Sequence, residues 1–314
     1  MSKIGWKENR SVYTFLRPEE RTKNKTRWKE NVVAYTFLGP ALLLLSMFLV
    51  IPSIMSAYYS FTDYYLLTPD MRKFVGLDNF INLFQDPIFL KSLVNTLEFV
   101  VWVIPLQIGA ALGLALLLNK QRKANTFFKV AYFSPVVMSL VVISVLWLYL
   151  LNPNEGIINN VLTYFGISAQ PFLTSPKQAI FTIVVVSAWQ GAGFQMLIFL
   201  AGLQNIPGDV YEAAQLDGIN KWQRFMYITL PLLKPTSIFI FITTLIGAFK
   251  LLVQPMVMTQ GGPVNSTMTV VYYIYQTGFT DRMVGYASSI ALLFGTIIGL
   301  VTITQRKLVK EDED

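Results

Sequence analysis

The chain has 314 residues, of which 54% are hydrophobic and only 14% are charged, and its mean hydropathy is +0.49. A soluble protein carries about a quarter charged residues. A chain this apolar cannot cover itself with a water-compatible surface, so the composition predicts a membrane protein. Cysteine and histidine are both absent. Their absence excludes disulfides, Cys/His zinc sites, thiol nucleophiles, Ser-His-Asp triads and histidine-ligated haem.

Six stretches are long and apolar enough to cross a bilayer, which takes about 20 residues of helix. In chain order they are Val33–Phe61, Leu93–Leu118, Ala131–Leu151, Ile180–Leu203, Thr236–Val257 and Gly285–Thr304. The sequence therefore predicts an all-α membrane protein with six transmembrane helices. We expect a basic tail over 1–32, a transmembrane domain over 33–307 and an acidic tail over 308–314. Residues 24–32 either form an interfacial helix on anionic lipid or belong to a solvated tail.

The distribution of basic residues predicts the orientation of these spans. Of the 25 Lys and Arg, nineteen lie in the two tails and in the loops 119–130 and 204–235, and five lie in the other loops. Cytoplasmic loops of membrane proteins carry the excess of basic residues. Both termini are therefore expected on the cytoplasmic side, and the net charge of +7 reflects orientation rather than nucleic-acid binding.

Several kinds of chemistry have no sequence support. No G-x-x-x-x-G-K-[ST] motif occurs, so no P-loop can hold ATP, and no strand precedes the glycine pair Gly191 and Gly193 as a dinucleotide site requires. A secondary carrier driven by protons needs ionisable groups at membrane depth, and Lys250 is the one serious candidate. We expect a transporter component rather than an enzyme, with a stand-alone secondary carrier as the alternative.

The loop 204–235 contains helix signals that a simple linker would lack. Pro207 and Asp209 favour a helix start, Gly218 can end that helix in a left-handed conformation, and Lys221–Tyr227 can form a second short helix. The pattern predicts a helix–Gly–helix projection into the cytoplasm. It could be a docking element for another protein or an amphipathic connector lying on the membrane.

A spaced motif in this loop resembles the EAA loop of binding-protein-dependent ABC importer permeases, in the carbohydrate-uptake subgroup that includes the maltose and glycerol-3-phosphate permeases. The motif consists of Glu212-Ala213-Ala214, three residues, Gly218, nine residues, Ile228, one residue and Leu230-Pro231. The resemblance covers about 33–307. It extends to Phe61-Thr62-Asp63-Tyr64, Val75-Gly76-Leu77-Asp78-Asn79-Phe80, Asn95-Thr96, Phe199-Leu200-Ala201-Gly202-Leu203-Gln204 and Thr259-Gln260-Gly261-Gly262-Pro263. The family usually has Gly where Gln260 stands.

The resemblance implies a division of labour in a prokaryotic plasma membrane. Two homologous permeases form the path, two ATPase subunits bind ATP and magnesium, and an extracytoplasmic binding protein delivers a sugar; the permease itself needs no cofactor. The resemblance also makes the cytoplasmic loop the ATPase-coupling element. Glu212 would face a basic or polar ATPase residue, Ala213 and Ala214 would pack against that subunit, Asp217 would offer a second charge and Gly218 would make the bend.

The fourth predicted span carries the first group of candidate substrate-path residues. Gln190 lies ten residues into the span, about 15 Å deep and near the midplane. Ser187, Gly191 and Phe194 share one face, and matching Trp189-x-Gly191 to the family motif turns that face toward the sugar. The alternative is that Gly191 and Gly193 only permit close helix packing, with Gln190 bonding across helices.

The fifth predicted span supplies Lys250, Leu251 and Gln254, and related permeases place sugar contacts in this segment. A lysine in this position has two interpretations. It could form an anionic-sugar site, or it could extend to the membrane surface or pair with the partner permease.

Overall fold

The structure is a computed structural model that describes residues 23–120 and 123–311. The described chain is helical, with one isolated antiparallel bridge between Thr62 and Phe74. It divides into two compact units, the first ending at Met55 and the second beginning at Ser56. Residues 1–22 of the predicted basic tail and 312–314 of the predicted acidic tail lie outside the described residues.

The first predicted span is helical from α1 to α2. Helix α1 covers Lys23–Leu45, a π-helical turn η2 covers Ser46–Val50 and α2 covers Ile51–Tyr59. Pro52 lacks the N–H that would bond the carbonyl of Phe48, and the π turn lies immediately before it. The backbone of 24–32 is helical and continuous with the span; whether this segment lies on anionic lipid stays a prediction.

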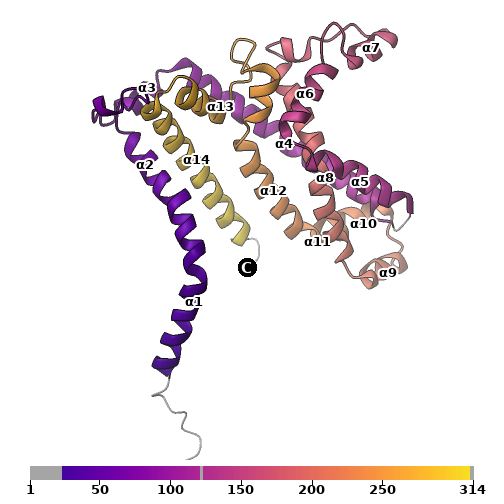
Figure 1. The fold of residues 1–314 in the computed structure, drawn as a ribbon. Helices are drawn as coiled ribbons and strands as arrows, with labels where there is room; N and C mark the ends of the chain where they lie inside the picture. The colour runs from indigo at the N-terminus through magenta and orange to yellow at the C-terminus, as the bar shows by residue number, and fades with distance from the viewer. Residues whose placement is uncertain (1–22, 121–122, 312–314) are drawn as a thin grey trace, which may run out of the picture. The chain divides into compact units, whose positions relative to one another are not determined.

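The second unit is built around two long helices, α4 (Pro87–Leu118) and α8 (Ala179–Gln204), which pack along each other (Figure 1). Helices α5 (Lys123–Val137) and α12 (Lys234–Phe249) pack on this pair. Gly193 allows the closest approach, because a Cβ there would overlap the backbone carbonyl of Tyr132 in α5. The predicted close-packing role of glycine in this span is therefore confirmed for Gly193.

Shorter elements connect and cover these helices. Before α4 lie η3 (Pro69–Met71) and α3 (Asp78–Leu83), and between α5 and α8 lie α6 (Leu140–Leu150), α7 (Ile157–Tyr164) and η4 (Phe172–Thr174). Before α12 lie α9 (Gly208–Leu216), α10 (Lys221–Arg224), η5 (Phe225–Thr229) and α11 (Leu230–Leu232). After α12 come η6 (Pro255–Thr259), α13 (Val270–Tyr275), η7 (Gln276–Thr280) and the last helix, α14 (Val284–Glu311).

Two of the predicted spans are bent. Among the residues that the structure describes, four helices are long and apolar enough to cross a membrane, and up to six spans result if each bent pair counts as one. The predicted span Ala131–Leu151 is the pair α5 and α6, bent by 101° after Val137. The predicted span Thr236–Val257 leaves helical geometry at Lys250, and α12 is itself bent by 66° from the helical segment Lys221–Leu232.

The early end of α12 coincides with one local feature and one contact from a distant segment. Pro255 has no N–H to donate to the carbonyl of Leu251, four residues earlier. That carbonyl instead accepts a hydrogen bond from Thr269 Oγ1 at 2.7 Å. The α-helical ladder therefore cannot continue through this point, and the chain runs into a non-helical stretch at 250–252.

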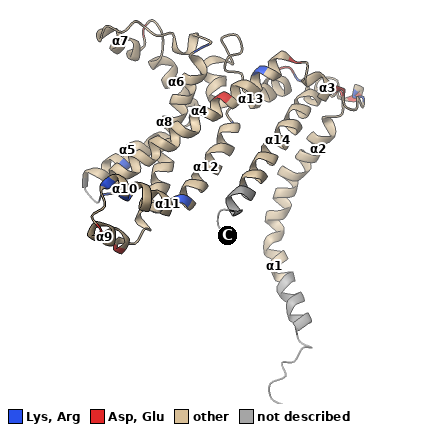
Figure 2. Cartoon of the chain, turned by 180° about the vertical axis from the view of Figure 1, so that it is seen from behind, with Lys and Arg blue, Asp and Glu red and all other residues tan. Residues whose placement is uncertain are grey.

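Most charged side chains of the second unit lie near helix ends, although α4 carries Lys91 and Glu98 in its first half. Figure 2 shows acidic and basic residues around α9, α10 and α11, with another group near α3. Helix α8 contains no charged residue, and α12 has only Lys234, at its first position. This distribution matches helices that cross an apolar layer with their ends in polar surroundings.

Candidate functional site

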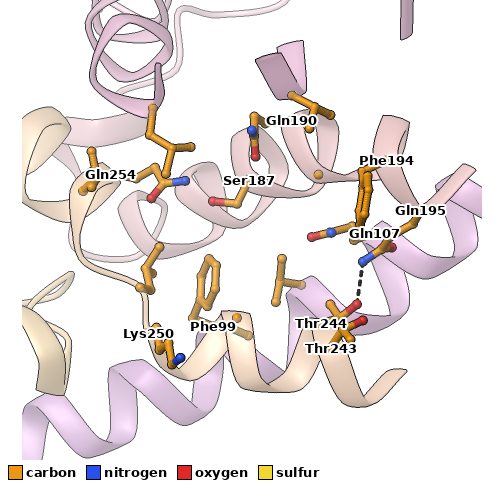
Figure 3. A pocket seen from close by; sticks show the side chains of 18 of the residues that line it. Phe99, Gln107, Ser187, Gln190, Phe194, Gln195, Thr243, Thr244, Lys250 and Gln254 are labelled. Carbon is orange, nitrogen blue, oxygen red and sulfur yellow. Dashed lines mark hydrogen bonds between the residues drawn. The ribbon is translucent and has the colours of Figure 1, made fainter. Parts of the chain in front are cut away.

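A cavity of about 370 Å³ lies among α4, α5, α6, α8 and the region after α12. Almost all of the polar side chains that line it are uncharged. Four glutamines and three hydroxyl residues line it: Gln107, Gln190, Gln195, Gln254, Ser187, Thr243 and Thr244. Phe99 and Phe194 add aromatic surface, and most of these side chains are drawn in Figure 3. Of the described residues, Lys250 is the only ionisable one in the lining.

Helix α8 brings one face of its predicted residues into this cavity. Ser187, Gln190, Gly191 and Phe194 all line it, as their helical spacing predicts. Gly191 leaves room for a neighbour, because a Cβ there would overlap the Gln107 side chain from α4. Trp189 does not line the cavity. Its ring packs edge to face against Trp147, with the ring centroids 5.4 Å apart, and its predicted contact with the sugar stays a prediction.

The segment after α12 forms the opposite wall. Lys250, Leu251 and Gln254 all line the cavity. Lys250 is exposed and follows the last residue of α12, where the negative end of the helix dipole stabilises a cation. The predicted span had placed Lys250 inside a helix. In the structure, Lys250 lies at the end of one.

Two buried oxygen atoms of the cavity wall have no hydrogen-bond partner within the described part of the chain. Gln195 Nε2 donates to Thr244 Oγ1 at 2.5 Å, which leaves Gln195 Oε1 unpaired. Ser187 Oγ is also unpaired. Both side chains are more than nine-tenths buried. Buried polar atoms in native proteins are normally satisfied, so these two unpaired oxygens, on residues that line the cavity, leave hydrogen-bonding capacity in its wall.

Sequence reasoning missed Gln107, Thr243 and Thr244. Gln107 is a polar residue in the middle of the second apolar stretch, and such residues usually face a bundle interior or a cavity. That signal was present in the sequence. The threonines had no comparable signal, because threonine is common in membrane helices and can bond its own helix backbone, as Thr243 does to Phe239.

The predicted helix–Gly–helix projection forms a defined local structure in the second unit. Helix α9 begins after Pro207, with Asp209 in its first turn. Gly218 adopts φ +72°, and the N–H groups of Gly218 and Ile219 donate to Gln215 and Ala214. These two bonds form a Schellman motif, which ends helices at a left-handed residue. The loop therefore has one fixed conformation at this bend.

The second short helix is tied to the first. A capping box joins Asn220 and Gln223 at the start of α10. The Tyr211 hydroxyl from α9 lies 3.2 Å from Thr229 Oγ1 in η5, and the Arg224 guanidinium lies 5.7 Å from the centre of the Tyr211 ring. These contacts connect α9 to the helical segment Lys221–Leu232, which precedes α12.

The candidate coupling residues differ in their exposure. Glu212, Ala213, Asp217 and Gly218 are exposed. Ala214 is only 5% exposed, so its side chain packs within this chain, and its predicted contact with an ATPase subunit stays a prediction. Leu216, which was not predicted as a contact residue, is 90% exposed.

Comparison with known proteins identifies the family. Residues 95–310 match the family described as binding-protein-dependent transport system inner membrane component. The chain belongs to this family. A probable ABC transporter permease protein, YurN, from Bacillus subtilis is 34% identical over 88% of this chain and 95% of its own length. The lactose transport system permease protein LacF from Rhizobium radiobacter is 35% identical over 87% of this chain and 92% of its own.

A further relative is also a transport permease, and a solved structure has a similar fold. The arabinooligosaccharides transport system permease protein AraP of Bacillus subtilis is 34% identical over 86% of both chains. A chain of a bacterial alginate ABC transporter, solved in complex with an alginate-bound periplasmic protein, aligns with TM-score 0.80 over 92% of this chain and 98% of its own, at 22% identity. The family and its sugar-transport relatives favour an ABC importer permease over a stand-alone secondary carrier.

Proposed function

We propose that this chain is one of two permease subunits of an ABC importer and that its cavity contacts a sugar or oligosaccharide during transport. An extracytoplasmic binding protein delivers the sugar, and two partner subunits bind ATP and magnesium and hydrolyse ATP. The observation that carries the proposal is the ring of uncharged amide and hydroxyl groups with two unpaired buried oxygens. Sugars present both donors and acceptors, and an aromatic wall suits their apolar faces.

The proposal counts each bent pair as one span, which makes six, and places both termini in the cytoplasm. Helix α9 then lies on the cytoplasmic side and docks on an ATPase subunit. Only residues 205–207 separate α9 from the end of α8. The contacts of Tyr211 connect α9 to the helical segment Lys221–Leu232, which leads into α12. Because α8 and α12 both line the cavity, a rigid displacement of α9 would move two of its walls.

Uptake by reconstituted vesicles tests the sugar path. The chain is assembled with its second permease, two ATPase subunits and binding protein, and ATP-driven uptake is measured. Ser187→Ala removes a hydroxyl that is free to bond a sugar, and a hydrogen bond is worth about 0.5–1.5 kcal/mol. We expect uptake at low sugar concentration to fall about two- to tenfold. Ser144→Ala is the matched control, since Ser144 is equally buried but bonds its own helix and lines no described cavity. Equal uptake by both variants would contradict the proposal.

The same vesicles decide the role of Lys250. As the cavity's one described ionisable group, it would attract an acidic sugar most strongly when the cavity is closed to water. Lys250→Met should then lower uptake of an acidic oligosaccharide much more than uptake of a neutral one. An equal effect on both would mean that Lys250 has a structural role and that the sugar is neutral.

A further inference from the structure

A second cavity, of about 560 Å³, lies between the end of α6, α7 and the first half of α8. Its walls are mainly apolar and aromatic. The lining residues are Trp147, Leu151, Ile158, Gln170, Phe172, Lys177, Gln178, Phe181, Thr182, Val185 and Val186. None of them lines the cavity described above, so the proposed sugar path leaves this second cavity without a role.

The two cavities lie on opposite faces of α8. Thr182 lines the second cavity and Gly191 lines the first. These residues are nine positions apart, which is about two and a half helical turns. Gln178 and Ser187 have the same separation and the same division between the cavities. If one face of α8 lines the sugar path, the second cavity therefore faces away from it.

The amide groups in the second cavity are already engaged within the chain. Gln178 Nε2 donates to Gln170 Oε1 at 3.0 Å, and Gln178 Oε1 accepts from the N–H of Phe172 at 2.9 Å. Gln170 Nε2 donates to the carbonyl of Ser168. These bonds hold the loop before α8, and they leave few groups that could match the alternating donors and acceptors of a sugar. A second sugar site here is therefore disfavoured.

The remaining polar groups are donors. The indole Nε1 of Trp147 is buried and has no partner among the described residues. Lys177 is exposed at the cavity and lies two residues before the first residue of α8. The positive end of the dipole of this 26-residue helix reinforces its charge. The site thus combines one cation and one free N–H with apolar walls formed by side chains such as Phe181 and Val185.

We propose that this cavity binds an anionic phospholipid. The headgroup phosphate meets Lys177 at the start of α8, and an acyl chain lies against Phe181 and Val185 along the face that points away from the sugar path. Lysine and tryptophan are the side chains that membrane proteins place at headgroup depth. Both Phe181 and Val185 are more than 40% exposed in the chain, so a lipid chain would cover apolar surface that this subunit leaves open.

Native mass spectrometry of the purified full chain tests this site, with phosphatidylglycerol and phosphatidylcholine of equal chain length added at matched concentrations. The wild-type chain should retain phosphatidylglycerol in preference to phosphatidylcholine. Lys177→Gln should weaken retention of the anionic lipid about fivefold, the effect of one basic residue near an anionic membrane surface, and leave the neutral lipid unchanged. Val185→Trp should fill the cavity and weaken retention of both lipids, and Phe181→Ala provides a second, smaller change to the same wall.

Lys91→Gln is the matched control. Lys91 is an exposed lysine on the same predicted side of the membrane, near the start of α4, and it does not line this cavity. An equal effect of Lys91→Gln and Lys177→Gln would show nonspecific surface charge and overturn the proposal. Equal retention of the two lipids by the wild type would also overturn it, as would undiminished lipid retention by Val185→Trp. Lipid retention is measured without transport, so the result is independent of the proposed sugar path.

Discussion

Gln260 occupies a backbone conformation that favours glycine. Its φ is +50° and its side chain is exposed, so nothing in the packing requires a glutamine there. A non-glycine residue in this region carries strain of order 1 kcal/mol. The conformation gives a physical reason for the glycine that related permeases usually have at this position.

Gln260→Gly is therefore expected to raise the free energy of unfolding by about 0.5–1 kcal/mol, since relief of the strain outweighs the greater freedom of glycine in the unfolded chain. Thermal unfolding in detergent measures the change. Gln260→Ala keeps the Cβ and should give no such gain. A decrease in stability for Gln260→Gly would mean that the glutamine side chain makes a contribution larger than the strain.

Asp86 joins three elements through its side chain. Its Oδ1 accepts the N–H of Ile88 at 2.8 Å and of Phe89 at 3.3 Å at the start of α4. Its Oδ2 accepts from the hydroxyls of Tyr273 and Tyr286, at 2.6 and 2.8 Å. Burial acts to raise the pKa of Asp86, but these hydrogen bonds together outweigh it and hold the pKa below its ordinary value.

A carboxylate with a lowered pKa in the folded state stabilises the fold above its unfolded pKa of about 4, and this contribution is lost as the pH falls through the folded value. Asp86→Asn should therefore lower the thermal midpoint at pH 7. The difference from wild type should shrink below pH 4. Unfolding curves at pH 7, 5 and 3.5 give the comparison, and a difference that does not change with pH would assign the effect to the altered hydrogen bonds rather than to the charge of Asp86.

At the scale of elements, the bend at Gly218 determines the direction of α9. A Cβ at Gly218 would meet no atom within 4 Å, so substitution strains only the backbone, at φ +72°. The strain for a residue with a Cβ is about 1 kcal/mol or more, and it is lowest for asparagine. A substitution at Gly218 would first break the two Schellman hydrogen bonds, from the N–H groups of Gly218 and Ile219.

Gly218→Val should misdirect α9 and uncouple ATP hydrolysis from uptake in the reconstituted importer, with the spans still inserted. Gly218→Asn tolerates the left-handed conformation and should remain close to wild type. The ratio of ATP hydrolysed to sugar transported is the measurement. If Gly218→Val kept the wild-type ratio, α9 would not be the transmitting element.

At the scale of the whole chain, the described helices pack into two apolar cores. One apolar cluster includes Phe99, Ile183 and Ile290, and a second includes Met196, Leu233 and Ile240. Both contain residues of α4 and α8, the pair on which the other helices pack. The energy for a transport cycle is then expected to come from subunits outside this chain.

The purified chain alone should therefore hydrolyse no ATP, and co-expression with its ATPase subunits and second permease should produce hydrolysis stimulated by the loaded binding protein. A phosphate-release assay on both preparations tests this. Hydrolysis by the subunit alone, free of contaminating ATPase, would refute the division of labour.

Local chemistry was sufficient to predict much of this protein from its sequence. Long uncharged stretches indicated membrane helices, Gly218 indicated the end of α9, and the helical spacing of Ser187, Gly191 and Phe194 placed them on one face. Each of these depends on residues within a few turns of one another. The family resemblance rested on the same local motifs, and the match over residues 95–310 confirmed it.

Contacts between distant segments decided the rest. The end of α12 at Lys250 depends on a hydrogen bond from Thr269 to Leu251, eighteen residues apart in the sequence. Trp189 lies against Trp147, and Gln107 reaches the cavity beside Gly191, because α4, α6 and α8 pack where they do. Hydropathy and helical period describe one helix at a time, whereas a cavity and its unpaired oxygens exist only once several helices have packed together.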